Sequence, residues 1–310
     1  MPLNKDEEIF LEEFKKIKLD PNYGDHLIWS RTLASSLETE NDCKNAERII
    51  AIDLINPLFF EIPPSIKKLR RLRKLKLISG GKVKLIPDSL ADIPTLEELQ
   101  FEYLNLRKLP EGIGSLSELK YLSFEFNHID SIPNTFKPES KLLHLKFRGN
   151  NITSLPKSLK WCRELTVIRG SKNLITQLPQ FIGEFHKLRV MHFARNEIQK
   201  IPNSIGNLIN LEELNLNNNA IASVPDRLCL CTSLKKLSLS NNNITELPTR
   251  LGELTSLEFL SLNGNRIKNL PSSLFDLRKL KILHLDGLSL SSKDERLLQK
   301  KMPNTKCCLN

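Results

Sequence analysis

The stretch that decides the fold is LKKLSLSNNNITELPTRLGEL, residues 234–254. It follows the pattern L-x-x-L-x-L-x-x-N-x-I-x-x-L-P-x-x-L-x-x-L, and close copies of that pattern recur along most of the chain. Prolines mark the period, because they occur at positions 63, 87, 110, 133, 156, 179, 202, 225, 248 and 271, with a first interval of 24 residues and later intervals of 23. A repeat of this length predicts a solenoid whose units stack on their neighbours.

Each part of the repeat has a structural role that follows from its residues. The apolar residues of x-L-x-L-x alternate, which is the period of a half-buried strand, so we expect Leu237 to stack on Leu214 and Leu260. Asn242 sits where the chain turns inward, and its amide can bind backbone groups that a buried turn would leave unpaired. Pro248 opens a short convex turn, where its missing N–H does no harm.

These residues resemble the leucine-rich-repeat family, in particular its intracellular 23-residue class with the signature LPxxIGxL, as in Ras-suppressor-like, erbin/scribble-like and bacterial leucine-rich-repeat proteins. The resemblance implies an α/β fold, a right-handed β/α solenoid (horseshoe) with a parallel sheet on its concave face. We count about eleven repeats, whose strands begin near Ile49, Leu72, Leu96, Leu119, Leu142, Leu165, Leu188, Leu211, Leu234, Leu257 and Leu280.

The two ends of the chain depart from the repeat, as terminal repeats of a solenoid usually do. We expect residues 1–46 to form a helical N-terminal cap and residues 47–290 to form the solenoid. Two segments of the cap have a helical apolar face, made of these residues: Phe10, Phe14 and Ile17 in the first, and Trp29, Leu33 and Leu37 in the second.

Residues 291–310 are expected to form a C-terminal cap. Ser292 and Glu295 have the spacing of a capping box, which predicts a helix that runs to about Lys301 and stops before Pro303. The tail after that helix can add a closing strand. Within the solenoid, Glu139 follows Pro138 at an apolar position of the repeat, so the convex side of the fourth repeat should be irregular.

The charge and the cysteines bear on partners and compartment. Lysine and arginine outnumber aspartate and glutamate by 46 to 36, which suits an acidic partner but equally keeps a long solenoid soluble. The chain begins MPLNKDEEIF, which is not a secretory signal, and it has no apolar stretch long enough for a transmembrane segment. None of its cysteines forms an N-terminal disulfide cluster. We therefore expect a cytoplasmic protein, with export by a non-classical route as the alternative.

No catalytic motif is present, so we expect neither an enzyme nor a bound cofactor or metal. Cys231 occupies the apolar position held by Leu208 and Leu254, which indicates a core residue. Cys307 has the spacing of a prenylation site, but the last residue, Asn310, fits that signal poorly, and we expect no membrane anchor there. The basic run 67–76 carries its leucines at repeat positions, which favours a structural role over contact with an anionic partner.

Function in such a scaffold depends on the side chains that flank the strand leucines on the concave face. In repeats three to seven these positions hold large rings beside acidic and basic groups, whereas repeats eight to ten look neutral. Exposed aromatic and arginine side chains contribute strongly when a partner buries them. The candidate partner-binding residues are Glu102, Tyr103, Tyr121, Glu125, Phe126, His144, Lys146, Arg148, Arg169, Lys172, His192 and Arg195.

The sequence thus predicts a non-catalytic intracellular scaffold or adaptor, a monomer that binds a protein of mixed charge through repeats three to seven. Two alternatives remain. The basic repeats are compatible with nucleic acid or an anionic surface, although Glu102 and Glu125 in the same groove would repel phosphates. A bacterial chain of this kind is also compatible with a host-directed effector that acts by sequestering its partner.

Overall fold

The computed structural model describes residues 8–9, 37–41, 47–55, 61–79 and 83–308. It divides into two compact units, of which the first ends at Asn151 and also includes Pro156–Cys162, and the second comprises Ile152–Leu155 and the chain from Arg163 onward. Most of the predicted N-terminal helical cap lies outside the described residues. Only Glu8 and Ile9 within it are described as helical.

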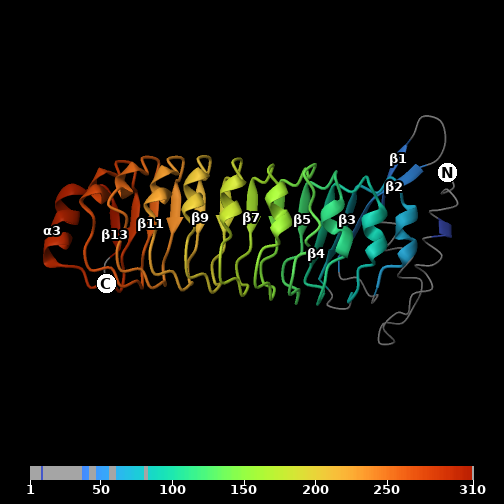
Figure 1. Cartoon of the computed structure of the whole chain (residues 1–310), viewed down its shortest axis with the longest axis horizontal. Coiled ribbons are helices and arrows are strands. Elements are labelled where there is room, and N and C mark those ends of the chain that lie inside the picture. Colours follow the sequence, from blue (N-terminus) through green and yellow to red (C-terminus); the bar gives the residue numbers. More distant parts are fainter. Residues whose placement is uncertain (1–7, 10–36, 42–46, 56–60, 80–82, 309–310) are drawn as a thin grey trace. The chain divides into compact units, whose positions relative to one another are not determined.

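In the first unit the strands pair in sequence order (Figure 1). They are β1 (Leu37–Asn41), β2 (Glu47–Ile55), β3 (Lys74–Ile78), β4 (Glu98–Glu102), β5 (Tyr121–Ser123) and β6 (His144–Lys146). All neighbours from β2 to β6 are parallel, whereas β1 pairs with β2 in the antiparallel direction. The prediction that Leu37 lies on a helical face is therefore wrong. A hairpin strand there pairs with backbone groups of β2 that an open sheet edge would leave unpaired.

The second unit contains a parallel sheet of its own, with each strand paired to the next. Its strands are β7 (Val167–Arg169), β8 (Val190–His192), β9 (Glu213–Asn215), β10 (Lys236–Ser238), β11 (Phe259–Ser261), β12 (Ile282–His284) and β13 (Lys306–Cys308). Leu237 pairs with Leu214 on one side and Leu260 on the other, as predicted. The eleven strands β2 to β12 correspond to the predicted repeats, and each unit is built as a β/α solenoid.

A short 3-10 turn follows most repeat prolines. These turns are η1 (Pro64–Lys68), η2 (Asp88–Asp92), η3 (Glu111–Ser115), η4 (Lys157–Trp161), η5 (Gln180–Glu184), η6 (Asn203–Asn207), η7 (Asp226–Leu230), η8 (Leu251–Glu253) and η9 (Ser272–Asp276). The fourth repeat has no such turn between β5 and β6, within the described chain. Pro138 explains the irregularity predicted there, because a proline disfavours helical backbone at the residue before it.

The core consists of the repeat leucines and isoleucines, among which Leu237 and Leu239 are each 1% exposed. In the fourth to tenth repeats one asparagine, buried or half-buried, lies beside them and bonds to backbone groups. The Asn242 Oδ1 atom accepts from the Ile221 N–H at 3.0 Å, and its Nδ2 atom donates to the carbonyl oxygens of Leu216 at 3.0 Å and Leu239 at 2.9 Å. One side chain thereby satisfies three backbone groups in two successive repeats, which confirms its predicted structural role.

The C-terminal end carries the one long helix that the model describes, α3 (Ser292–Lys301), followed by β13. Its N-cap is Ser291, whose Oγ atom accepts from the Asp294 N–H at 3.2 Å, so the predicted capping box of Ser292 with Glu295 is wrong by one residue. Ser291 is preferred because its backbone is extended (φ −71°, ψ 145°), as an N-cap requires. No helix in the described chain is both long and apolar enough to cross a membrane.

We predict that Asn242→Ala lowers the free energy of unfolding by about 3 kcal/mol, since an unsatisfied buried backbone group costs about 1–3 kcal/mol. Chemical denaturation followed by circular dichroism measures the loss. Asn243→Ala is the matched control, because Asn243 is only half-buried and lies next to Asn242. Equal stability of the two variants would contradict the role given to the buried amide.

We also predict that Gly206→Ala is destabilising by about 1–3 kcal/mol, the usual cost of overpacking. Gly206 lies in η6, and a methyl group there would overlap the carbonyl oxygen of Arg227 in the next turn. Asn207→Ala changes the adjacent exposed residue and should leave the thermal midpoint nearly unchanged. A Gly206→Ala protein as stable as the wild type would show that the successive turns are not closely packed.

Candidate functional site

One position in the repeat forces the backbone into the left-handed region. Residues with positive φ occur there at intervals of 23 positions: Tyr103, Phe126 and Gly149 in the first unit, and Lys172, Arg195, Asn218, Asn241, Gly264 and Gly287 in the second. We call this set the left-handed column. Glycine and asparagine tolerate such backbone best, so five of its nine members need no special explanation.

Four members of the left-handed column are neither glycine nor asparagine: Tyr103, Phe126, Lys172 and Arg195. The aromatic members are Tyr103 and Phe126. Their φ angles are 57° and 53°, where a bulky aromatic residue is an outlier that costs on the order of 1–3 kcal/mol. The repeat does not need a ring there for folding, since Gly149, Gly264 and Asn241 occupy the same position. These two rings therefore carry a conformational cost that the fold itself does not explain.

The rings of Tyr103 and Phe126 lie against one another. Their centroids are 4.5 Å apart and their planes differ by 10°, which is a stacked pair. The Arg148 guanidinium lies 5.3 Å from the centroid of the Phe126 ring, within the range of a cation–π contact. Gly149 leaves room for the ring, because a Cβ atom there would lie 2.8 Å from Phe126 Cδ1. We call Tyr103, Phe126 and Arg148 the aromatic platform.

The aromatic platform is open to solvent. Tyr103 remains 49% exposed despite the stacking, and Arg148 is also exposed. A second group lies on the neighbouring strands of the same unit. The Tyr121 ring meets His144 edge-on at 5.6 Å, and Lys146 donates a hydrogen bond to the Tyr121 hydroxyl oxygen at 2.7 Å. That bond holds the ammonium at the hydroxyl end of the ring.

The two acidic candidates differ in their surroundings. The Ser123 hydroxyl donates to Glu102 Oε1 at 2.5 Å, and Ser123 is fully buried although it lies in register with Gln100 and Lys146. Glu125 contributes its backbone, because its carbonyl oxygen accepts from the Tyr103 N–H at 3.1 Å. Glu125 belongs to the repeat after that of Tyr103, so this bond fixes the left-handed backbone of Tyr103 from the next repeat.

In the second unit the predicted residues lie on β7, β8 and the left-handed column. Arg169 ends β7 in register with His192 of β8. Lys172 and Arg195 are neighbours in the column. Burial and the positive charge of Arg169 lower the pKa of His192, although its Nε2 atom lies 3.4 Å from Glu213 Oε2. His192 is therefore neutral at neutral pH, and Arg169, Lys172 and Arg195 supply the positive charge.

Many other basic residues beside the strands already have acidic partners one repeat away. The pairs are Arg73–Glu97, Lys120–Glu97 and Lys141–Glu118 in the first unit, and Lys187–Glu164, Arg189–Glu212, Lys235–Glu212, Lys236–Glu213 and Lys281–Glu258 in the second. Exposed pairs of this kind add little stability, but they neutralise charge. Arg169 and Arg195 take part in no ion pair within the described residues, so their charge is available to a partner.

Three cysteines of the described chain are buried in the core. Burial raises the pKa of the Cys162 and Cys231 thiols to about 12 and that of Cys229 to about 11, and all three are fully buried. Such thiols stay protonated and unreactive at neutral pH. The described residues contain no cluster of three or more histidine, cysteine, aspartate or glutamate side chains that would bind a metal. Cys307 lies in β13, paired with Leu283.

Sequence reasoning missed two features of this surface. It counted Tyr103 and Phe126 as separate exposed rings, although comparing the same position in every repeat, where glycine and asparagine are frequent, would have identified the left-handed column. It also counted the eighth to tenth repeats as neutral, although the tenth carries Phe259, and it did not consider Ile282, which occupies the same outward position in the eleventh repeat. The signal was an apolar residue at the same strand position in two consecutive repeats.

Comparisons with known proteins agree with this architecture. Residues 222–297 match the model of a leucine-rich repeat region, and residues 186–228 match the model of two leucine-rich repeats. No curated protein matches the chain in sequence.

Several solved structures are similar. A leucine-rich-repeat protein of Leptospira interrogans is 24% identical, with a TM-score of 0.54 over 80% of this chain and 75% of its own. The plant peptide hormone receptor RGFR1, solved in complex with RGF2, is 26% identical, with a TM-score of 0.66 over 83% of this chain and 46% of its own.

The functional domain of InlJ from Listeria monocytogenes is 21% identical, with a TM-score of 0.66 over 78% of this chain and 50% of its own. This chain thus spans about half the length of the receptor and of the InlJ domain. The repeat, the buried asparagines and these matches lead to one conclusion: the chain contains leucine-rich repeats.

Proposed function

We propose that this protein is a non-catalytic interaction module that binds a protein partner, with the aromatic platform as the central contact of its first unit. The observation that carries the proposal is the stacked and conformationally costly pair formed by Tyr103, which is 49% exposed, and Phe126, which is half-buried. Strained residues that the fold does not require are found where they serve binding or catalysis.

The chemistry of the aromatic platform suits a protein surface. Aromatic and arginine side chains dominate binding energy at protein interfaces, where each contributes about 2 kcal/mol or more when a partner buries it. Tyr103 offers a flat apolar ring with a hydroxyl group, and Arg148 adds a guanidinium beside the Phe126 ring. The stacking also fixes both rings before a partner arrives, which reduces the entropy lost on binding.

The second unit adds the other part of the proposal. Arg169 and Arg195 supply positive charge without an acidic partner in the described chain, so we expect them to contact acidic side chains of the bound protein. We further propose that this binding takes place in the cytoplasm. The buried Cys162, Cys229 and Cys231 are all free thiols, which suits a reducing compartment.

We predict that the double change Tyr103→Asn and Phe126→Asn abolishes capture of the main partner without lowering the thermal midpoint. Asparagine suits the left-handed backbone, so relief of strain offsets the lost stacking. Partners are measured by affinity purification from cell extract with quantitative mass spectrometry, and we expect at least a tenfold loss. Asn241→Gly, at the same column position in the second unit, is the matched control. A double variant that keeps every partner would overturn the platform proposal.

For the basic residues we predict that the double change Arg169→Gln and Arg195→Gln weakens capture of the protein partner. The remaining binding of that partner should depend less on salt concentration. Exposed charges are screened over about 10 Å at 0.1 M salt, so removing them removes that dependence. Arg227→Gln, which lies in η7, is the control. Capture that is sensitive to nuclease, or a salt-dependent gel shift with nucleic acid, would favour nucleic acid over a protein partner.

A further inference from the structure

The helix α3 presents a basic face on the side away from the core of the second unit. Figure 1 shows α3 at the C-terminal end of that unit, beyond the last repeat. The buried residues of the helix are Asp294 and Leu298. Because an α-helix turns by about 100° per residue, Lys293, Arg296 and Lys300 project from the opposite side, and all three are exposed. We call these three residues the basic face.

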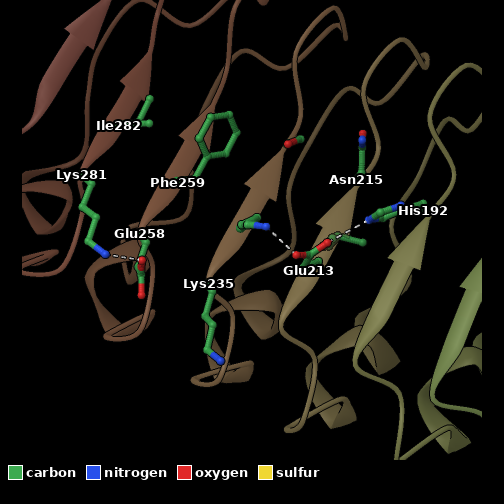
Figure 2. A pocket seen from close by; sticks show the side chains of 11 residues that line it. His192, Glu213, Asn215, Lys235, Glu258, Phe259, Lys281 and Ile282 are labelled. Carbon is green, nitrogen blue, oxygen red and sulfur yellow. Dashed lines mark hydrogen bonds and ion pairs between the residues drawn. The ribbon is translucent and has the colours of Figure 1, made fainter.

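The charges of the basic face are not neutralised by acidic side chains. None of its three residues takes part in an ion pair or a side-chain hydrogen bond within the part of the chain that the structure describes. Figure 2 shows the opposite situation beside the last repeat strand, where Lys281 reaches Glu258 at 2.6 Å. The charge of the basic face is therefore available to an anionic partner, whereas that of Lys281 is already paired.

The stability of the helix does not explain this arrangement. Lys300 and Lys301 lie in the last turn, where the helix dipole favours cations. Lys293 lies in the first turn, where the same dipole disfavours a cation. Arg296 and Lys300 are like charges four residues apart, which is a destabilising spacing. Lys293 and Arg296 thus weaken the helix slightly, which points to a role outside folding.

An apolar side chain lies among these cations. Leu297 is half-buried and stands four residues from both Lys293 and Lys301, so it lies between them on the helix surface. Helices that lie on membranes combine such groups, because apolar side chains reach the acyl boundary while lysine and arginine meet anionic headgroups. Clusters of about four to eight cations on one helix are typical of helices that bind anionic lipids, and α3 carries four cations.

Nucleic acid fits this surface less well. Residues 291–308 contain no aromatic residue on which a base of a single strand could stack. Duplex bases are read mainly by arginine, asparagine and glutamine, and the basic face has a single arginine. We propose that the basic face of α3 binds a membrane surface that carries anionic lipids. This contact is separate from the capture of a protein partner by the aromatic platform.

The test is sedimentation of the full chain with lipid vesicles at about 0.1 M salt. Phosphatidylcholine vesicles that contain about 30% phosphatidylserine should carry the protein down, and pure phosphatidylcholine vesicles should not. Raising the salt to about 0.5 M should weaken binding at least about tenfold, because it screens exposed charges. No binding to the anionic vesicles, or equal binding to both kinds, overturns the proposal.

The matching variant changes all of the basic face: Lys293→Gln, Arg296→Gln and Lys300→Gln. Each cation near an anionic membrane strengthens binding about fivefold, so the triple variant should bind anionic vesicles about 100-fold more weakly. Arg296→Lys keeps the charge and should bind like the wild type. A triple variant that binds normally, or a charge-preserving variant that does not, contradicts the proposal. Thermal melting checks that each variant folds.

A second triple variant separates the basic face from the net charge of the protein. Lys200→Gln, Arg227→Gln and Lys268→Gln remove the same number of exposed charges from the repeats of the second unit. This control should bind anionic vesicles within about threefold of the wild type, because its charges lie outside α3. An equal loss in the two triple variants would assign the binding to net charge and overturn the site.

Two measurements on the wild-type chain identify the partner and the place of contact. A phosphatidylserine analogue with a photoreactive headgroup should crosslink to residues 292–301, and crosslinks confined to other segments overturn the assignment. A DNA duplex that binds through the basic face more tightly than the anionic vesicles would replace lipid by nucleic acid. The triple variant of the basic face should still capture the protein partner, so failure of lipid binding leaves the platform proposal standing.

Discussion

The amide of the asparagine that recurs from the fourth to the tenth repeat is the interaction on which the rest of the structure depends. Asn127 shows the same arrangement as Asn242: its Oδ1 atom accepts from the N–H groups of Leu104 and Leu106, and its Nδ2 atom donates to the carbonyl oxygens of Phe101 and Phe124. A turn that enters the core would otherwise leave these groups without water or a backbone partner. Because each amide bonds to two successive repeats, it also fixes the register between them.

Features that recur were predictable because each repeat provides the same information again. The strands, the Asn242-type amides and the core leucines such as Leu237 follow from the period of 23 residues. Features that occur only once in the chain could not be predicted in this way. The strand β1 pairs with β2 at the edge of the sheet. The apolar pattern around Leu37 has the period of a helix, so it does not indicate that a strand forms there. The Ser123 hydroxyl donates a hydrogen bond to Glu102, and no sequence spacing predicts a bond between those two side chains.

The candidate site was predictable in composition but not in geometry. The sequence placed large rings and basic groups in the third to seventh repeats, and the structure shows which of them touch. Tyr103 and Phe126 stack because both occupy the left-handed column, and Arg148 joins them. In the second unit, charge pairing decides which basic groups are available: Lys235 and Lys236 are engaged by glutamates, and the net charge of the chain does not reveal that difference.

The left-handed column has a consequence for how such a protein changes over generations. Its residues sit on the outer side of turns whose inner side the asparagine already stabilises, so a substitution there leaves the buried hydrogen bonds intact. Glycine, asparagine, lysine, arginine and two aromatic residues all occupy it in this one chain. Selection for a new partner can therefore act on the column without breaking those bonds, at a conformational cost of about 1–3 kcal/mol for a bulky residue. Gene duplication of a repeat would supply another such position with each copy.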